Sequence, residues 1–101
     1  MIVLTTLSAG ADADGFARTL VDERLAACVN VLPAMSSTYR WKGAVERDDE
    51  RQLLIKTTRA RLGQLEARVR ELHPYETPEF VILEATASAA YAAWVGESTG
   101  R

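Results

Sequence analysis

The sequence predicts an α+β fold, a ferredoxin-like βαββαβ sandwich with a short C-terminal helix. The first reason is the order of patterns along the chain, in which strand-like and helix-like segments follow one another as strand, helix, strand, strand, helix, strand. The second is that two such crossover units share one antiparallel sheet and place both helices on the same face. The third is length, because 101 residues make one domain, residues 1–101, and leave no room for a second.

The opening residues predict the first strand and the first helix. Residues 2–4 are a continuous apolar run followed by two β-branched threonines, which is typical of a strand covered on both faces. Asp12 and Asp14 are candidate N-caps. Residues 13–25 are expected to form a helix, since their apolar positions recur near period 3.6. These positions are Phe16, Ala17, Leu20, Val21 and Leu25.

The middle of the chain predicts two further strands. Residues 29–32 are expected to form a strand that is interrupted at Pro33, with extension resuming from Ser37 to Trp41. Proline cannot donate to a ladder, so this strand should lie at an edge or carry a bulge. The stretch "KGAVERDDE", residues 42–50, is expected to be a hairpin connection with Gly43 at its turn. The third strand follows at residues 51–58.

The second half of the chain contains the clearest helix, residues 60–72. Its apolar positions are spaced by three and four, with charged residues on the other faces. Pro74 forbids continuation of this helix. Residues 79–85, "EFVILEA", predict the last strand, and residues 88–95 a short helix capped by Ser88.

Two of these strands are apolar on both faces, although the fold gives only one face of the sheet a helix layer. The simplest resolution is that another subunit covers the second face, so the pattern predicts an oligomer.

Composition narrows the classes of function. The chain is 48% hydrophobic and 26% charged, with a formal net charge of −2, which argues against binding of nucleic acid. No stretch is long and apolar enough to span a membrane, and no targeting segment opens the chain. The single cysteine excludes an intrachain disulfide, so we expect a cytoplasmic protein.

Five blocks in order resemble the CutA family of divalent-cation tolerance proteins. They are "ERLAACVNVLP", "SSTYRWKG", "ERQLLIKT", "LHPYETPE" and a closing Tyr91-x-x-Trp94. The resemblance implies a ferredoxin-like homotrimer in the bacterial cytoplasm, linked to copper and other divalent metals and similar to PII-type signalling trimers. It implies neither a known catalytic reaction nor an organic cofactor. Some copper-associated members carry a Cys and a second His where this chain has Thr5 and Leu72.

The junction "LHPYETPE", residues 72–79, is the best candidate site, because it gathers polar groups with little structural reason to cluster. His73 is the only histidine, and neutral imidazole suits copper, zinc and nickel. With Glu76 or Glu79 it predicts weak binding of Cu²⁺ or another divalent cation. The alternative is a histidine that pairs locally beside a helix end.

A ligand cleft between subunits is the second expectation. Tyr39 and Trp41 should share one face of their strand, with Arg40 on the other. Lys56 is either the cationic floor of a cleft for an anion or a member of a structural ion pair. The cleft residues are Cys28, Tyr39, Trp41, Glu50, Lys56 and Tyr75.

Other functions on the same fold remain open. A small hydrolase would need a phosphate-binding loop with an arginine after the first strand, and "TTLSAGADADG" has none. An RNA-recognition module would need aromatic residues on the central strands, which are missing here. The remaining alternative is a structural trimer that scaffolds a partner protein.

Overall fold

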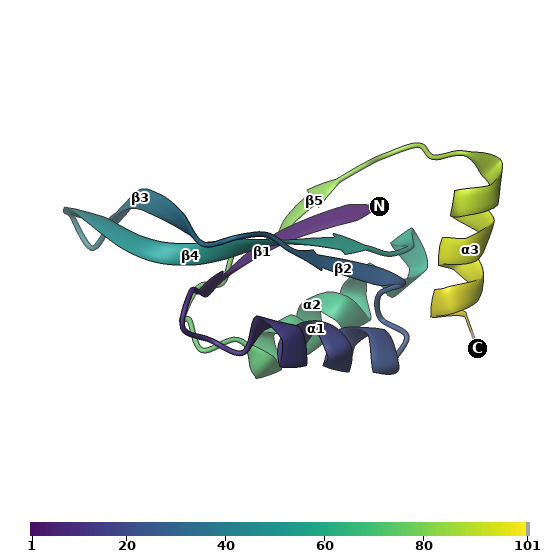
Figure 1. Cartoon of the computed structure of the whole chain (residues 1–101), viewed down its shortest axis with the longest axis horizontal. Coiled ribbons are helices and arrows are strands. Elements are labelled where there is room, and N and C mark those ends of the chain that lie inside the picture. The colour runs from purple at the N-terminus through teal and green to yellow at the C-terminus, as the bar shows by residue number, and fades with distance from the viewer. Residues whose placement is uncertain (101) are drawn as a thin grey trace.

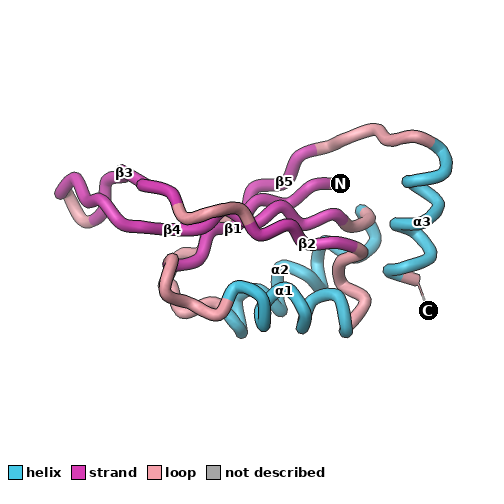
Figure 2. Tube along the Cα trace, in the orientation of Figure 1, coloured by secondary structure: helices cyan, strands magenta, loops and turns pink. Residues whose placement is uncertain are grey.

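The computed structural model describes residues 1–100; Arg101, the last residue of the predicted domain, lies outside the described residues. Nine elements follow one another along the chain (Figures 1 and 2). They are β1 (Ile2–Ser8), α1 (Ala13–Asp22), β2 (Cys28–Val31), β3 (Met35–Trp41), β4 (Ala44–Lys56), the 3₁₀ turn η1 (Arg59–Arg61), α2 (Leu62–Leu72), β5 (Val81–Leu83) and α3 (Ala89–Thr99). No helix among the described residues is long and apolar enough to cross a membrane.

The strands form one antiparallel sheet, and the predicted α+β class and order of elements are confirmed. The sheet runs β2-β4-β1-β5, with β3 also paired to β4. α1 and α2 lie together on one face, while α3 stands beyond the end of the sheet (Figure 1). The core between sheet and helices is built from Val3, Leu7, Leu53 and Ile55 of the strands and from Phe16, Leu20, Leu65 and Val69 of the helices.

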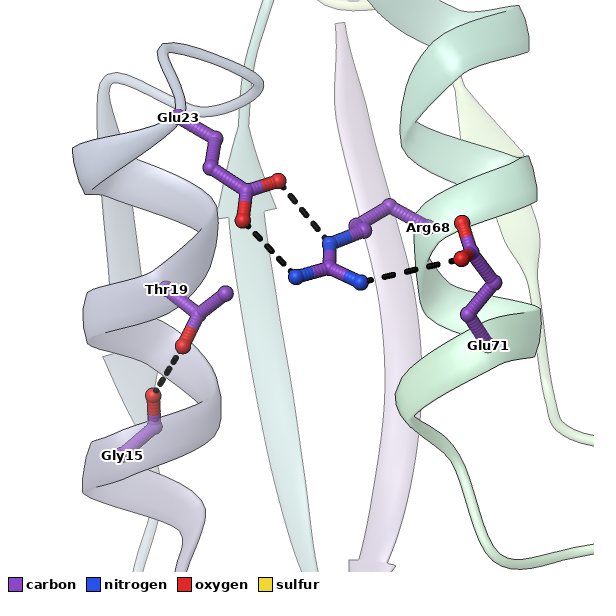
Figure 3. A network of polar contacts seen from close by, with 5 residues as sticks. All are labelled: Gly15, Thr19, Glu23, Arg68 and Glu71. Carbon is purple, nitrogen blue, oxygen red and sulfur yellow. Dashed lines mark hydrogen bonds and ion pairs between the residues drawn. The ribbon is translucent and has the colours of Figure 1, made fainter.

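A partly exposed ion pair joins the two helices. Arg68 of α2 donates two hydrogen bonds, of 2.9 and 2.8 Å, to the carboxylate of Glu23 at the end of α1 (Figure 3). The Arg68 side chain is only about one-third exposed, and Glu71 lies 3.8 Å from its other nitrogen. The hydrogen bond to Glu23 raises the pKa of Arg68. This bidentate geometry fixes the position of α2 relative to α1.

β4 corrects the prediction for residues 42–50. That stretch is not a connection: β4 begins at Ala44 and continues unbroken to Lys56. The connection is only Lys42 and Gly43, whose φ values of 51° and 84° are those of a two-residue type I′ turn. Charged side chains have low strand propensity, yet here pairing with β3 decides the conformation.

Pro33 interrupts the strand as predicted. β2 ends at Val31 and β3 begins at Met35, and both pair with the same β4. A side chain bridges the break, because Arg51 Nη1 donates to the backbone oxygen of Leu32 at 3.2 Å. Pro33 therefore divides one strand into two segments that a continuous neighbour keeps aligned.

The helix ends differ from the predictions by a few residues. α1 ends at Asp22 instead of residue 25, because Arg24 adopts a positive φ of 60° and turns the chain. The amide of Leu25 then returns to Leu20 O at 3.0 Å, a C-terminal capping pattern that glycine usually serves. α3 continues to Thr99, beyond the predicted end at residue 95, and Ser88 caps it as predicted.

The second face of the sheet is uncovered within the chain, and we call it the open face. Its apolar side chains are those of Ile2, Leu4, Leu54, Val81 and Leu83, aligned by the register of β1 with β4 and β5. Val81 is 44% and Leu83 45% exposed. No helix of the described residues covers the open face, which the sequence pattern assigned to contact with another subunit. That contact remains a prediction.

Candidate functional site

The junction after α2 is built around a buried histidine. α2 ends at Leu72, and His73 is extended with ψ 131°, as the following proline requires. His73 is 6% exposed, and its ring lies edge-on to that of Phe16, with centroids 6.3 Å apart. His73 thus belongs partly to the core, and its side chain is oriented toward β1.

Both ring nitrogens of His73 are occupied. The amide of Tyr75 donates to Nδ1 at 3.1 Å, so the proton of the neutral ring lies on Nε2. Nε2 is 2.6 Å from the backbone oxygen of Thr6 and donates to it. β5 pairs with β1 only at residues 2–4, so the histidine supplies a hydrogen bond at an edge position that β5 does not reach.

The next residues of the junction fold over the open face. Tyr75 Oη donates to Glu50 Oε2 at 2.8 Å. Burial and then this hydrogen bond raise the pKa of Tyr75 well above its ordinary value. Gln52 Nε2 donates to Glu79 Oε2 and to the backbone oxygen of Thr5, both at 2.8 Å. The bonds to Glu50 and Gln52 attach the junction to β4, and the second bond of Gln52 joins β4 to β1.

The β3–β4 hairpin forms the other wall. It projects beyond the helix layer (Figure 1), and Tyr39 and Trp41 are each 40% exposed on it. Tyr39 Oη donates to the carboxylate of Asp48, which with partial burial raises the pKa of Tyr39 to about 12. Arg40, which lies between Tyr39 and Trp41 in the sequence, donates from Nη1 to the backbone oxygen of Gly43 at 3.5 Å.

Between these walls lies a hollow of about 660 Å³, which we call the acidic hollow. Its lining comes from β1, the β3–β4 hairpin and the junction. The lining residues are Thr6, Met35, Ser37, Thr38, Tyr39, Trp41, Asp48, Glu50, Gln52, Tyr75, Glu76, Thr77, Pro78 and Glu79. Four of them are carboxylates and none is Lys, Arg or His, so the hollow is negative.

The acidic hollow unites part of the predicted set. Tyr39, Trp41, Glu50 and Tyr75 of the predicted cleft line it. Glu76 and Glu79 of the predicted metal set line it as well. Sequence reasoning missed Asp48 and Gln52, which the strand alternation from Glu50 would have placed on the same face once β4 was known to be continuous.

Cys28 and Lys56 lie elsewhere. They face each other across β2 and β4, near the N-terminal end of β1. Lys56 is six positions along β4 from Glu50, about 20 Å at ~3.4 Å per residue. Within one chain, Lys56 is therefore not the floor of the hollow.

The predicted metal ligands are not assembled in the single chain. Among residues 1–100 there is no group of three or more His, Cys, Asp or Glu side chains placed to hold a metal ion. Both ring nitrogens of His73 already form hydrogen bonds. Glu76 is exposed and Glu79 is half-buried. Metal ligation by His73 stays a prediction, and it would require His73 to give up a hydrogen bond.

Comparison with known proteins gives a consistent result. A sequence model described as "CutA1 divalent ion tolerance protein" matches residues 1–98. "Divalent-cation tolerance protein CutA" of Thermus thermophilus is 46% identical over 100 residues, covering 98% of this chain and 97% of that protein. "Protein CutA" of Homo sapiens is 42% identical over 84 residues, and this chain matches 47% of its length.

Solved structures show the same similarity. The divalent cation tolerance protein of Thermus thermophilus superposes with a TM-score of 0.91 at 45% identity, covering 98% of this chain and 97% of that one. The PII-like protein CutA from Nostoc, in apo form, superposes with a TM-score of 0.88 at 38% identity, covering 98% of this chain and 96% of that one.

Proposed function

Because the chain belongs to the CutA1 family of divalent ion tolerance proteins, we propose that it is a homotrimeric binding protein whose ligand site is the acidic hollow. Its relatives are named for tolerance of divalent cations and not for a reaction. Its fold is that of a PII-like protein, which supports a signalling role through ligand-dependent contacts. The observation that carries the proposal is the uncovered open face with the hollow at its border.

The open face supports association of identical chains. Val81 and Leu83 are nearly half exposed on β5, and Tyr91 and Trp94 are 39% and 44% exposed on α3. A soluble monomer rarely presents so many large apolar side chains together. Association through these surfaces would remove them from water, and the family resemblance implies three copies.

Light scattering tests this proposal with a matched pair of variants. The native protein should scatter as about three times the 11.1 kDa chain mass at micromolar concentration. Val81→Lys should lower the mass to that of one chain. Val21→Lys is the control, because Val21 is similarly exposed, at 40%, but lies on α1 away from the open face. A native protein of single-chain mass, or equal effects of both variants, would refute the proposed interface.

Weak binding of divalent cations is part of the same proposal. Carboxylate oxygens at Glu76 and Glu79 are the accessible donors, and Cu²⁺ leads the divalent affinity order. His73 would join only by releasing the oxygen of Thr6 or the amide of Tyr75. This cost predicts low affinity and coupling of metal binding to movement of the junction.

Calorimetric titration with Cu²⁺ separates the candidate ligands. Glu79→Gln should weaken binding, whereas Cys28→Ser should leave it unchanged, because Cys28 lies on β2 opposite Lys56, at the end of β4 that is far from the hollow. Loss of binding in Cys28→Ser would move the site to the cysteine.

A cytoplasmic location belongs to this proposal too, and fractionation of cells should recover the protein with cytoplasmic markers.

A further inference from the structure

The charge of the acidic hollow is not balanced within the chain. Its carboxylates belong to Asp48, Glu50, Glu76 and Glu79. The ion pairs formed among residues 1–100 involve none of these four. Asp48, Glu50 and Glu79 accept hydrogen bonds from neutral donors, which are two tyrosine hydroxyls and one side-chain amide. The hollow therefore attracts a positive charge from outside.

Glu50 is the strongest point of that attraction. It is only 7% exposed, yet it lines the hollow. Tyr75 occupies Oε2, and no hydrogen bond to Oε1 forms among residues 1–100. Oε1 is not itself buried, so it opens into the hollow, where a donor or cation can reach it. The free oxygen of Glu50 is thus suited to a charged hydrogen-bond donor or a cationic group.

The other part of the lining is aromatic. Tyr39, Trp41 and Tyr75 all face the hollow, and aromatic faces attract organic cations through their quadrupole. Trp41 already carries a cation within the chain, since Lys42 Nζ lies 5.6 Å from its ring centroid. A volume of about 660 Å³ also suits a small organic molecule better than a single ion.

We propose that the acidic hollow binds a small organic cation, an ammonium or guanidinium group carried on a compact apolar body. The cationic group lies toward Glu50 and Asp48, and the apolar body packs on Tyr39 and Trp41. This assignment rests on the proposed role of the hollow as a ligand site. The proposed ligand is positively charged, whereas a cleft with Lys56 as its floor would select an anion.

Choline is a suitable probe, because its neutral isostere 3,3-dimethyl-1-butanol has the same shape without the charge. Each is titrated into the native assembly while the methyl proton resonances are followed by NMR. Choline should bind saturably with an upfield shift of its N-methyl signal, caused by the aromatic rings. The neutral alcohol should bind about tenfold more weakly or not at all, as expected when a cation–π contact and a charge pair are lost. Equal binding of both compounds would overturn the proposal.

Two adjacent residues provide a matched pair of variants. Asp48→Asn should weaken choline binding about fivefold to tenfold, since Asp48 lines the hollow. Asp49→Asn removes the same charge one residue along, but Asp49 lies on the other side of β4, where Arg47 contacts it at 2.8 Å. It should change binding less than twofold. Equal effects of the two variants would show that choline responds to the overall surface charge and not to the hollow, which would overturn the proposal.

Light scattering on the same samples distinguishes failure of the ligand from failure of the assembly. A native trimer that shows no choline shift overturns the organic-cation proposal and leaves the trimer intact. Weak divalent binding at Glu76 and Glu79 predicts only partial competition by Mg²⁺. A shift that Mg²⁺ at equal ionic strength abolishes completely, while NaCl does not, would assign the whole hollow to divalent metal and overturn the proposal. Loss of the trimer in Glu50→Gln would mean that a cationic side chain of a second copy occupies the hollow, which also overturns it.

Discussion

Thr5 and Thr57 are two buried threonines for which the same substitution should have opposite effects. Thr5 is 0% and Thr57 1% exposed, so neither hydroxyl reaches water. Thr57 Oγ1 donates to Leu25 O at 2.7 Å. Thr5 Oγ1 has no hydrogen-bond partner, and its side chain faces the helix layer with Val3 and Leu7, where no second subunit can reach it.

The magnitudes follow from this difference. A buried hydroxyl without a partner costs about 1–3 kcal/mol, and a methyl group in its place adds up to ~0.8 kcal/mol of apolar burial. Thr5→Val should therefore raise the free energy of unfolding by about 1–2 kcal/mol. Thr57→Val leaves the oxygen of Leu25 without its donor and should lower that free energy by about 1–3 kcal/mol.

Urea unfolding followed by circular dichroism measures both changes. All proteins must be compared at one concentration, because assembly contributes to apparent stability. The slope of free energy against urea should stay constant, so that a shifted midpoint reports stability alone. A lower midpoint for Thr5→Val would refute the reasoning. Shifts of both variants in the same direction would show that general hydrophobicity, and not hydrogen-bond satisfaction, controls these sites.

Three further substitutions test other local features. Arg24→Gly should raise the free energy of unfolding by about 1 kcal/mol in the same assay, because glycine adopts the positive φ of that residue without steric cost. A lower free energy of unfolding would mean that contacts of the Arg24 side chain outweigh this steric cost. Ultraviolet titration should show the phenol of Tyr39 ionising near pH 12, and Asp48→Asn should bring it back toward 10. Since the pKa of Tyr39 is raised in the folded state, its contribution to stability is complete below pH 10 and is lost as pH rises toward 12. An unchanged Tyr39 titration in Asp48→Asn would show that the hydrogen bond to Asp48 is not the cause of the raised pKa. His73→Ala should cost about 2–4 kcal/mol of unfolding free energy, because two hydrogen bonds and a buried ring are lost, and a cost below ~1 kcal/mol would contradict its structural role.

Most of the fold could be predicted because its signals are local. Proline at 74 ends α2, Ser88 caps α3, and apolar spacing identifies both crossover helices. The stretch 42–50 could not be predicted in this way. Its charged residues have low strand propensity, and only pairing with β3, a tertiary interaction, makes it a strand.

The candidate site was predicted in part for the same reason. The junction was recognisable from its composition, and strand alternation places Tyr39 and Trp41 together in the hollow. Burial of His73 against Phe16 depends on a contact between α2 and α1 that no local pattern reveals. Lys56 lies far from Glu50 because both belong to one continuous strand, whereas the sequence predicted a strand that began only at residue 51.

The continuity of β4 also has a consequence for the order of folding. Its first half meets β3 across a two-residue turn, and such hairpins close within about 1–10 μs. Its second half must meet β1, at the N-terminal end of the chain, and the entropy of closing that long loop slows the step. In the interval the edge of β4 is exposed to other unfolded chains. The charges of Arg47, Asp48 and Asp49 on its first half then disfavour intermolecular pairing, so residues that are unusual in a strand protect the chain from aggregation while it folds.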